Sequence, residues 1–490
     1  MSSLPPPSAT GVRIAGDRYQ WAIAWHGCVT AVRDARFGHA NPVVAVGIEA
    51  PGAGNLDDVV LYRTAPPHTY AQVKYAVDAA TPISEDYLCA LSDSGGPSIL
   101  EKIAESWRKV TSDATQADLV LITNRYPDHG DPLISGRDSR TGLLMPKAGR
   151  GGPRSAQGKA RARWASVAKV QEPDLRALLE TLRFDVGRDA AQVPDQLALL
   201  MMATGLRSDP QAVDAGIDWV ARQVLDGHRR LELNTILDAI AHLDLEAEGP
   251  ARAVVSIATL APDPAAADAD YALDWVDRFE GDDPFLKRHP ALPATWQELQ
   301  HDIEAAPSHL PPGTQAVALT GTVRLAPAFL AGAAFRMVTG TDVAVRQRGQ
   351  VWCSTQAATA QTPDCAEHVF GQGNDLAVAI AVATDPTDDV MDYLREASLP
   401  VARLLVYRPA TGSGDNSVPD GRAAAALALG IRDHLRRTCR RYQSAGRIHL
   451  FQACPMGLAV LMGHRWNGLR PTTIYEDLTT TYEPAFHINA

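Results

Sequence analysis

The chain has 490 residues, of which 46 are basic and 57 acidic, so its formal net charge is −11 at pH 7. This length exceeds one typical domain and predicts two or three. The acidic balance argues against a uniformly basic nucleic-acid coat, although it is compatible with a local basic groove. The six scattered cysteines form no Cys-x-x-Cys pair, and neither a signal peptide nor a bilayer-spanning apolar run is evident. We therefore expect a cytoplasmic protein without a membrane partner.

We expect the Pro-rich start of the chain, up to Thr10, to be a loose tail. The sequence of the remaining first half predicts an α/β arrangement. Helical spacing of apolar residues and short β-branched runs alternate along this half. The expected elements are a helix over 18–33, strands over 43–48, 58–62 and 71–77, a helix over 98–110 and a strand over 118–123.

The most informative polar residues lie between two of these strands and on them. Asp57 and Asp58 open one strand, and Gln72 and Lys74 stand two residues apart on the next. Because strand residues two apart share a face, Gln72 and Lys74 project together, and the Pro-rich turn brings that pair beside the aspartates.

Carboxylate and amide oxygens suit a hard cation such as Mg²⁺. A lysine beside the metal orients or helps deprotonate a water, or stabilises charge on a phosphate. The pattern therefore indicates metal-assisted phosphodiester hydrolysis, with Asp58 favoured over Asp57 because it lies nearer the strand. The competing interpretation is a hairpin turn, since Asn-Leu-Asp-Asp after Gly-Ala-Gly is turn chemistry.

The order helix, acidic strand, Gln-x-Lys strand, helix, strand resembles the core of PD-(D/E)xK nucleases. On that resemblance the metal-binding aspartate is Asp57 or Asp58, the second ligand position is Gln72 and the lysine is Lys74. Glu49 corresponds to an acidic position before the aspartate. The sequence departs from the usual motif because glutamine replaces the second carboxylate and PGAGN is inserted after Glu49.

The segment 143–170 contains no acidic residue and is punctuated by glycine and proline, so we expect a partly mobile basic loop. Following a nuclease-like core, such a loop is suited to holding a phosphate backbone, and the alternative is a solvated surface loop. The candidate DNA-binding residues are Lys147, Arg150, Arg154 and Lys159.

Helices are expected over most of 174–245 as a layer supporting this core, and an Ala/Pro/Asp stretch at 262–270 is expected to be a linker. We therefore predict an N-terminal domain over 1–262 and a C-terminal domain over 270–490. The C-terminal domain alternates strands and helices, which predicts a parallel sheet covered by helices, in two Rossmann-like halves fused near 371–375.

The C-terminal half resembles the SAVED domain, a fusion of two Rossmann-like, CARF-like subdomains that senses cyclic oligonucleotides. The stretches that carry this resemblance are DWVDRFEGDDPF, PATWQELQHDI, WCST, AVATDPTDDVMDYL and IHLFQACPMGLAVLMGHRWNGLRPTTIYEDL with YEPAFHI. The N-terminal half, through GDRYQW, the 49–74 run and LVLITN, resembles the nuclease fused to SAVED in effectors of CBASS anti-phage defence.

This resemblance implies a double-stranded DNA endonuclease that requires Mg²⁺. It also implies activation by a cyclic trinucleotide made by a partner nucleotidyltransferase, with ligand binding driving homo-oligomerisation. The alternative is a non-catalytic nucleotide sensor whose N-terminal domain serves assembly, suggested by the missing second carboxylate. A dinucleotide-dependent oxidoreductase is disfavoured because no Gly-x-Gly-x-x-Gly follows a strand.

An anionic ligand of such a domain is expected in loops after strands, near helix N-termini. Trp352 is a candidate for stacking on a base, with core packing as the alternative. The arginines are alternatively surface ion pairs. The candidate ligand-binding residues are Arg324, Trp352, Thr384, Arg408, Cys454, Pro455 and Met456.

Overall fold

The computed structural model describes residues 8–91, 95–111, 117–138, 141–356, 359–442 and 446–489. The chain divides into two compact units, Met1–Gly249 and Pro250–Ala490. Of the Pro-rich start, residues 1–7 lie outside the described residues, and a helix already begins at Ala9.

The linker predicted at 262–270 is wrong, because this segment lies inside the C-terminal unit. Its aspartates hold the chain to the first strand of that unit: Asp263 accepts a hydrogen bond from Ser256 Oγ (2.7 Å), and Asp270 accepts one from the Val254 amide (2.7 Å). Side-chain to backbone bonds of this kind order a stretch whose composition alone is typical of a linker.

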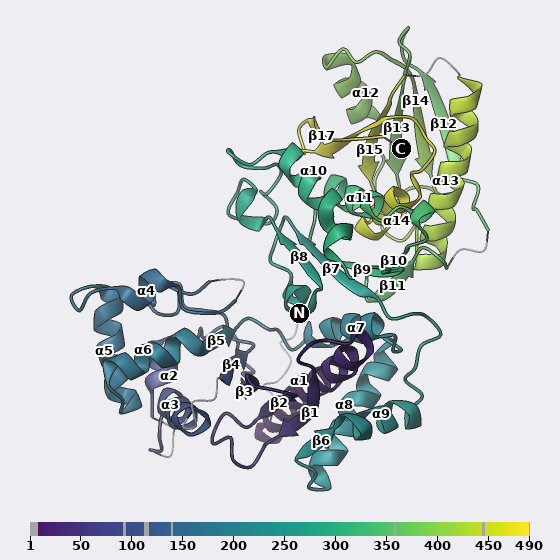
Figure 1. Ribbon diagram of the computed structural model, residues 1–490. Helices are drawn as coiled ribbons and strands as arrows, with labels where there is room; N and C mark the ends of the chain where they lie inside the picture. Colours follow the sequence, from purple (N-terminus) through teal and green to yellow (C-terminus); the bar gives the residue numbers. More distant parts are fainter. Residues whose placement is uncertain are drawn as a thin grey trace. The chain divides into compact units, whose positions relative to one another are not determined.

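The N-terminal unit is built on one six-stranded sheet (Figure 1). The first three strands form an antiparallel meander, whereas β4 runs parallel to β3 and β5 parallel to β4. The spatial order is β5 (Leu182–Asp185), β4 (Ala117–Thr123), β3 (His68–Lys74), β2 (Val59–Arg63), β1 (Val43–Ile48) and β6 (Arg230–Glu232).

Helices cover both faces of this sheet, each over its own apolar core (Figure 1). One face packs on α1 (Ala9–Phe37), α7 (Val193–Thr204), α8 (Pro210–Leu225) and α9 (Leu233–His242). The other face packs on α2 (Glu85–Cys89), α3 (Ile99–Val110), α4 (Pro146–Arg150), α5 (Ala156–Ala168) and α6 (Glu172–Thr181). The unit is therefore a three-layer α/β/α structure, in agreement with the expected α/β class.

Two predicted boundaries in this unit differ from the structure for identifiable reasons. The first helix is longer than 18–33 because Ser8 caps its start and Gly38, in the left-handed conformation (φ 66°), ends it. The strand predicted over 71–77 occupies His68–Lys74, since the Ala76 amide leaves the ladder and donates to Asn124 Oδ1 (2.8 Å).

The C-terminal unit contains two mainly parallel sheets with antiparallel edge strands (Figure 1). The first has the order β11 (Gln350–Cys353), β10 (Asp342–Gln347), β9 (Ala316–Thr320), β7 (Ala253–Ala258) and β8 (Tyr271–Asp274). The second has the order β12 (Asp364–Val369), β14 (Val401–Arg408), β13 (Asp375–Ala381), β15 (Ile448–Ala453), β16 (Thr472–Asp477) and β17 (Tyr482–Ile488).

Apart from the extra strand β12, the two sheets have the same strand order. In each, the second strand lies on one side of the first, and the later strands are added in turn on the other side. Two halves are therefore present, as expected, but the second sheet already begins with β12, before the predicted junction at 371–375. The helical elements of the unit are η1 (Pro264–Asp268), η2 (Val276–Arg278), α10 (Trp296–Ala305), η3 (Ala306–His309), α11 (Leu325–Ala334), η4 (Met337–Thr339), α12 (Thr387–Glu396), α13 (Gly421–Arg441) and α14 (Met456–Arg465).

Helices α11 and α14 pack against each other and join the halves in one apolar core (Figure 1). Their backbones cross at glycines. A Cβ at Gly332 would lie 2.0 Å from the Val460 carbonyl oxygen, and one at Gly463 would lie 1.9 Å from that of Phe329. Only glycine permits this approach, so these two residues set how closely the halves pack.

Each of these helices is also capped by the opposite half. Glu476 of β16 accepts a hydrogen bond from the Ala326 amide at the start of α11 (2.9 Å). Gln347 of β10 accepts one from the Gly457 amide at the start of α14 (2.9 Å). The two contacts are reciprocal, and they satisfy backbone donors that a helix leaves unpaired at its N-terminus.

None of the helices in the described part of the chain combines the length and apolar character needed to cross a bilayer.

Replacing Glu476 by glutamine is expected to flatten the pH dependence of stability. Burial raises the pKa of Glu476 to about 7 from its ordinary value of 4.5. The folded state thus keeps a proton that the unfolded chain releases, so stability falls as the pH rises from 4.5 to about 7. We expect a loss of about 3 kcal/mol in wild type that is absent from Glu476→Gln. Urea unfolding of both proteins across this pH range measures it, and parallel profiles would contradict the assignment.

Candidate functional site

The hairpin of β2 and β3 brings the predicted polar residues together. Val59 pairs with Ala71, so Asp58, just before β2, stands opposite Gln72. Asp58 Oδ2 accepts hydrogen bonds from the Val73 amide (2.7 Å) and from the Gln72 side-chain amide. The carboxylate is therefore fixed at the edge of the hairpin by backbone and side chain, more tightly than a simple turn residue requires.

Lys74 completes this cluster, with Nζ 3.6 Å from Asp58 Oδ2. The Asp58 side chain is 18% exposed and that of Lys74 is 35% exposed, whereas Gln72 is buried. A buried amide supports a carboxylate and an ammonium group that both reach solvent. The charged ends of the cluster are therefore open to solvent.

The neighbouring acids are crowded against one another. Burial, then the carboxylates of Asp58 and Glu49, raise the pKa of Asp57, and Lys74 only partly offsets this effect. Glu49 has a left-handed backbone (φ 45°), and its carboxylate forms an ion pair with Arg229. Glu49 is thus near the cluster but engaged, and the electrostatic environment of Asp57 favours an added cation.

The donor set fits Mg²⁺, which commonly binds one or two protein carboxylates and keeps several waters. Asp58 supplies a carboxylate, and Gln72 supplies an amide whose oxygen takes the place of its nitrogen after a half-turn of the side chain. Within the described residues no group of three or more His, Cys, Asp or Glu side chains is arranged to hold a metal. The site therefore suits a mostly hydrated ion.

The first helix supports this site from the side. Gln20 Nε2 donates to the Asp58 carbonyl oxygen (3.3 Å). Tyr19, its neighbour, is buried and donates to the Arg188 carbonyl oxygen (2.9 Å), so it is a core residue. Sequence reasoning missed Arg229, which lies 180 positions from Glu49 and carries no local signal.

The basic segment, predicted over 143–170 to be a partly mobile loop, contains the helices α4 and α5 joined by a short connection. Arg161 is buried in it and donates to the Ala148 carbonyl oxygen (2.8 Å) and to Glu172 (2.7 Å), which fixes α4 against α5 and α6. Arg163 and Lys169 form ion pairs with Glu85 and Glu101. No acidic side chain of the described ranges pairs with the four exposed cations that were predicted to bind DNA, Lys147, Arg150, Arg154 and Lys159.

In the C-terminal unit, five predicted ligand-binding residues share one edge of the second sheet. Strands β13 and β15 are parallel neighbours, with Ala381 opposite Ala453, so the loops that follow them meet. This is the point where the strand order reverses, the usual binding position in such sheets. The five residues at this edge are Thr384, Arg408, Cys454, Pro455 and Met456.

These residues differ in what they offer a ligand. Thr384 is exposed, while Arg408 forms an ion pair with Asp385 (2.6 Å). Cys454 is buried, and burial raises the pKa of its thiol to about 12, so it stays neutral. The useful donors here are Thr384, the backbone at the start of α14 and Arg408 once it leaves Asp385.

The prediction that Trp352 stacks on a base is wrong, because its side chain is fully buried. Its ring packs beneath the starts of α13 and α14, where a Cβ at Gly421 or Gly457 would lie 3.0 Å or 2.8 Å from it. The alternative of core packing is therefore correct, and the residue shapes the helix N-termini from below.

Arg324 lies apart from the other candidates, at the corresponding edge of the first sheet. It precedes α11, its amide donates to Thr259 Oγ1 (3.2 Å) and its Nε donates to the Lys287 carbonyl oxygen (2.8 Å). Sequence reasoning missed Lys287 and Glu476 nearby. A charged residue inside the buried strand pattern TTIYEDL was the available signal for Glu476.

Residues 299–488 match the model of the SAVED family, described as the SMODS-associated and fused to various effectors sensor domain. The matched segment runs from α10 to the end of β17. Over 462 residues the chain is 23% identical to CD-NTase-associated protein 4 of Enterobacter hormaechei, which covers 89% of this chain and 90% of that protein.

Two solved structures are similar at lower identity. One is the Acinetobacter baumannii Cap4 SAVED/CARF-domain containing receptor with the cyclic trinucleotide 3′3′3′-cAAA, at 15% identity and a TM-score of 0.43 over 99% of this chain and 100% of that one. The Moraxella osloensis Cap4 receptor has 14% identity and a TM-score of 0.41 over 97% and 100%. The similarity to the SAVED family therefore covers residues 299–488 of the C-terminal unit.

Proposed function

We propose that this chain is an anti-phage effector of the CBASS type, a double-stranded DNA endonuclease that requires Mg²⁺ and is activated by a cyclic trinucleotide. The observation that carries the nuclease assignment is the contact of Lys74 Nζ with Asp58 Oδ2 (3.6 Å) beside Gln72 on the adjoining strand. The SAVED match supports the sensor assignment.

In this proposal Asp58 and Gln72 hold the metal, with Asp57 and Glu49 adding negative charge around it. When bound, Mg²⁺ supplies an activated water and neutralises charge on the phosphate. Lys74 orients that water or takes part in its deprotonation, and its positive charge stabilises the pentavalent phosphate that forms. The Val73 backbone amide keeps Asp58 in place when the Gln72 amide turns to the metal.

DNA is held by the four exposed cations of α4 and α5 and the turn between them, Lys147, Arg150, Arg154 and Lys159. Their positive charge is local, which resolves how a chain of net charge −11 binds a polyanion. Because three other basic residues of the segment are already in ion pairs, the four are the ones available for phosphates.

The cyclic ligand binds at the edge of the second sheet where β13 and β15 end. The start of α14 is capped by the neutral Gln347 side chain, so its positive end is open to an anion. The start of α11 is occupied by the Glu476 carboxyl group, which is partly ionised near pH 7 because burial raises its pKa to about 7. A ligand phosphate is therefore better accommodated at α14, with Thr384 and Arg408 beside it.

A non-catalytic sensor is the second candidate function. It is favoured by the single firmly placed carboxylate, Asp58, and by the ion pair that engages Glu49. In that case the N-terminal unit serves assembly of a ligand-induced homo-oligomer in the cytoplasm. Metal-dependent cleavage of DNA distinguishes the two functions.

Lys74→Ala is expected to reduce DNA cleavage at least about 100-fold, the usual contribution of a group that assists proton transfer. Binding of the cyclic nucleotide should stay unchanged because Lys74 lies in the other unit. Plasmid cleavage with Mg²⁺ and calorimetric ligand binding measure the two properties. Lys109→Ala, an exposed lysine on α3, is the control, and cleavage by Lys74→Ala at the wild-type rate would rule out the assignment.

Alanine at Lys147, Arg150, Arg154 and Lys159 together is expected to weaken DNA binding and its salt dependence. The slope of log affinity against log salt should fall by about 1 for each phosphate contact removed. Fluorescence anisotropy with duplex DNA at several salt concentrations measures this slope. Arg163→Ala, whose side chain is paired with Glu85, is the matched control and should leave the slope unchanged; a slope equal to wild type in the fourfold variant would refute the DNA-binding role.

Activation is expected from one cyclic trinucleotide in a panel of cyclic di- and trinucleotides. With Mg²⁺ and that ligand the plasmid should be degraded, and light scattering should show a larger assembly. An intact plasmid despite calorimetrically confirmed ligand binding would favour the non-catalytic sensor.

A further inference from the structure

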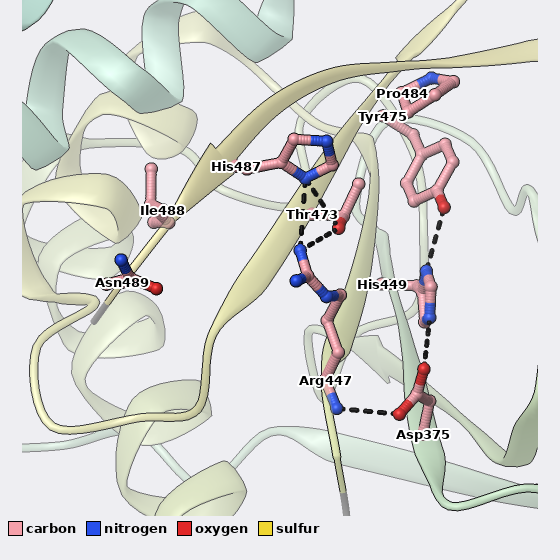
Figure 2. Close-up of a pocket in the computed structure, with 9 residues that line it drawn as sticks. All are labelled: Asp375, Arg447, His449, Thr473, Tyr475, Pro484, His487, Ile488 and Asn489. Carbon is pink, nitrogen blue, oxygen red and sulfur yellow. Dashed lines mark hydrogen bonds and ion pairs between the residues drawn. The ribbon is translucent and has the colours of Figure 1, made fainter.

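A cavity lies at the opposite end of the second sheet from the edge where β13 and β15 end. It has a volume of about 640 Å³ and is formed where β13, β15 and β16 begin and β17 ends (Figure 2). A strand of six or seven residues is roughly 20 Å long, so the two positions are distinct. A cavity of this size accommodates a ligand as large as a nucleotide.

Arg447 is the principal charge in this cavity. Its Nη1 contacts Thr473 Oγ1 (3.0 Å) and His487 Nδ1 (3.2 Å), which are both uncharged acceptors (Figure 2). No carboxylate of the described ranges forms an ion pair with its side chain. At the corresponding edge of the first sheet, by contrast, Arg252 is neutralised by Asp342 (2.6 Å).

His487 adds a second donor. Its Nδ1 accepts from Arg447 and from Thr473 Oγ1 (3.0 Å), so in the neutral ring the proton is on Nε2. Burial and then Arg447 lower the pKa of His487, which favours the neutral ring. Gln300 of α10 holds this strand in place through both backbone groups of His487 (2.7 and 3.2 Å).

The one acid in the cavity is already satisfied. Asp375 Oδ1 accepts from the Arg447 amide (2.8 Å), and Oδ2 accepts from His449 Nε2 (3.1 Å). His449 Nδ1 in turn accepts from the Tyr475 hydroxyl (2.9 Å), which fixes both rings (Figure 2). These bonds hold the Asp375 carboxylate against the Arg447 backbone and His449, while the Arg447 guanidinium and His487 line the cavity.

We propose that this cavity binds a small phosphorylated ligand of nucleotide size, with Arg447 and His487 as the residues that hold its phosphate. An uncompensated guanidinium in a preformed polar cavity is the arrangement that phosphate recognition requires. The proposal is independent of the nuclease site.

Calorimetry on the full chain with 5′-AMP, inorganic phosphate and adenosine tests this site in a phosphate-free buffer. AMP and phosphate are expected to bind, and uncharged adenosine is not. Arg447→Ala should weaken AMP binding roughly tenfold or more. Arg447→Lys keeps the positive charge but loses the paired N–H donors of the guanidinium group, so it should weaken binding less. Arg395→Ala removes an exposed arginine of the same unit that is paired with Asp392 and should bind as wild type.

Thermal unfolding of each variant separates loss of binding from loss of folding. A stabilising shift with AMP in wild type and Arg395→Ala, absent from a folded Arg447→Ala, supports the site. Failure of both phosphate and AMP to bind would overturn the proposal. So would equal binding of adenosine, or AMP binding by Arg447→Ala at wild-type affinity, since the phosphate would then lie elsewhere.

Discussion

The reciprocal capping of α11 and α14 is the contact on which the C-terminal unit depends. Each helix starts in one half and receives its cap from the other, through Glu476 and Gln347. The glycine crossing at Gly332 and Gly463 brings the two backbones into contact. Neither half alone satisfies its own helix N-terminus, so the two Rossmann-like halves have to fold as one body.

The two caps differ in chemical type. The Glu476 carboxyl group, whose pKa burial raises to about 7, caps α11, whereas the Gln347 amide, which is neutral at every pH, caps α14. Trp352 supports the start of α14 from beneath, where sequence reasoning had expected it to meet a ligand. The anion site proposed at α14 is thus on the helix that joins the halves.

In the N-terminal unit, the charged residues of the β2–β3 hairpin are also fixed by hydrogen bonds from their neighbours. Asp58 is held by Gln72 and the Val73 amide, so its position does not depend on a metal, while burial and neighbouring carboxylates raise the pKa of Asp57. Ion pairs of the α4–α5 segment anchor its helices and leave the remaining cations for solvent or a polyanion. An acidic chain thereby presents a basic surface without changing its overall charge.

The sequence by itself determined the α/β class, most of the strands and the neighbourhood of Asp58, Gln72 and Lys74, because these follow from periodicity and from a hairpin of nearby residues. It was misleading for 262–270 and for the basic segment, since both have compositions typical of loops. In the structure Asp263 accepts a hydrogen bond from Ser256, and Arg161 donates one to the Ala148 carbonyl oxygen, and these bonds hold the two segments in place. Only the tertiary structure decided the caps by Glu476 and Gln347, the burial of Trp352 and the cavity around Arg447. These features depend on contacts between residues far apart in the chain. A local sequence pattern does not indicate which distant residue will hydrogen-bond a buried polar group.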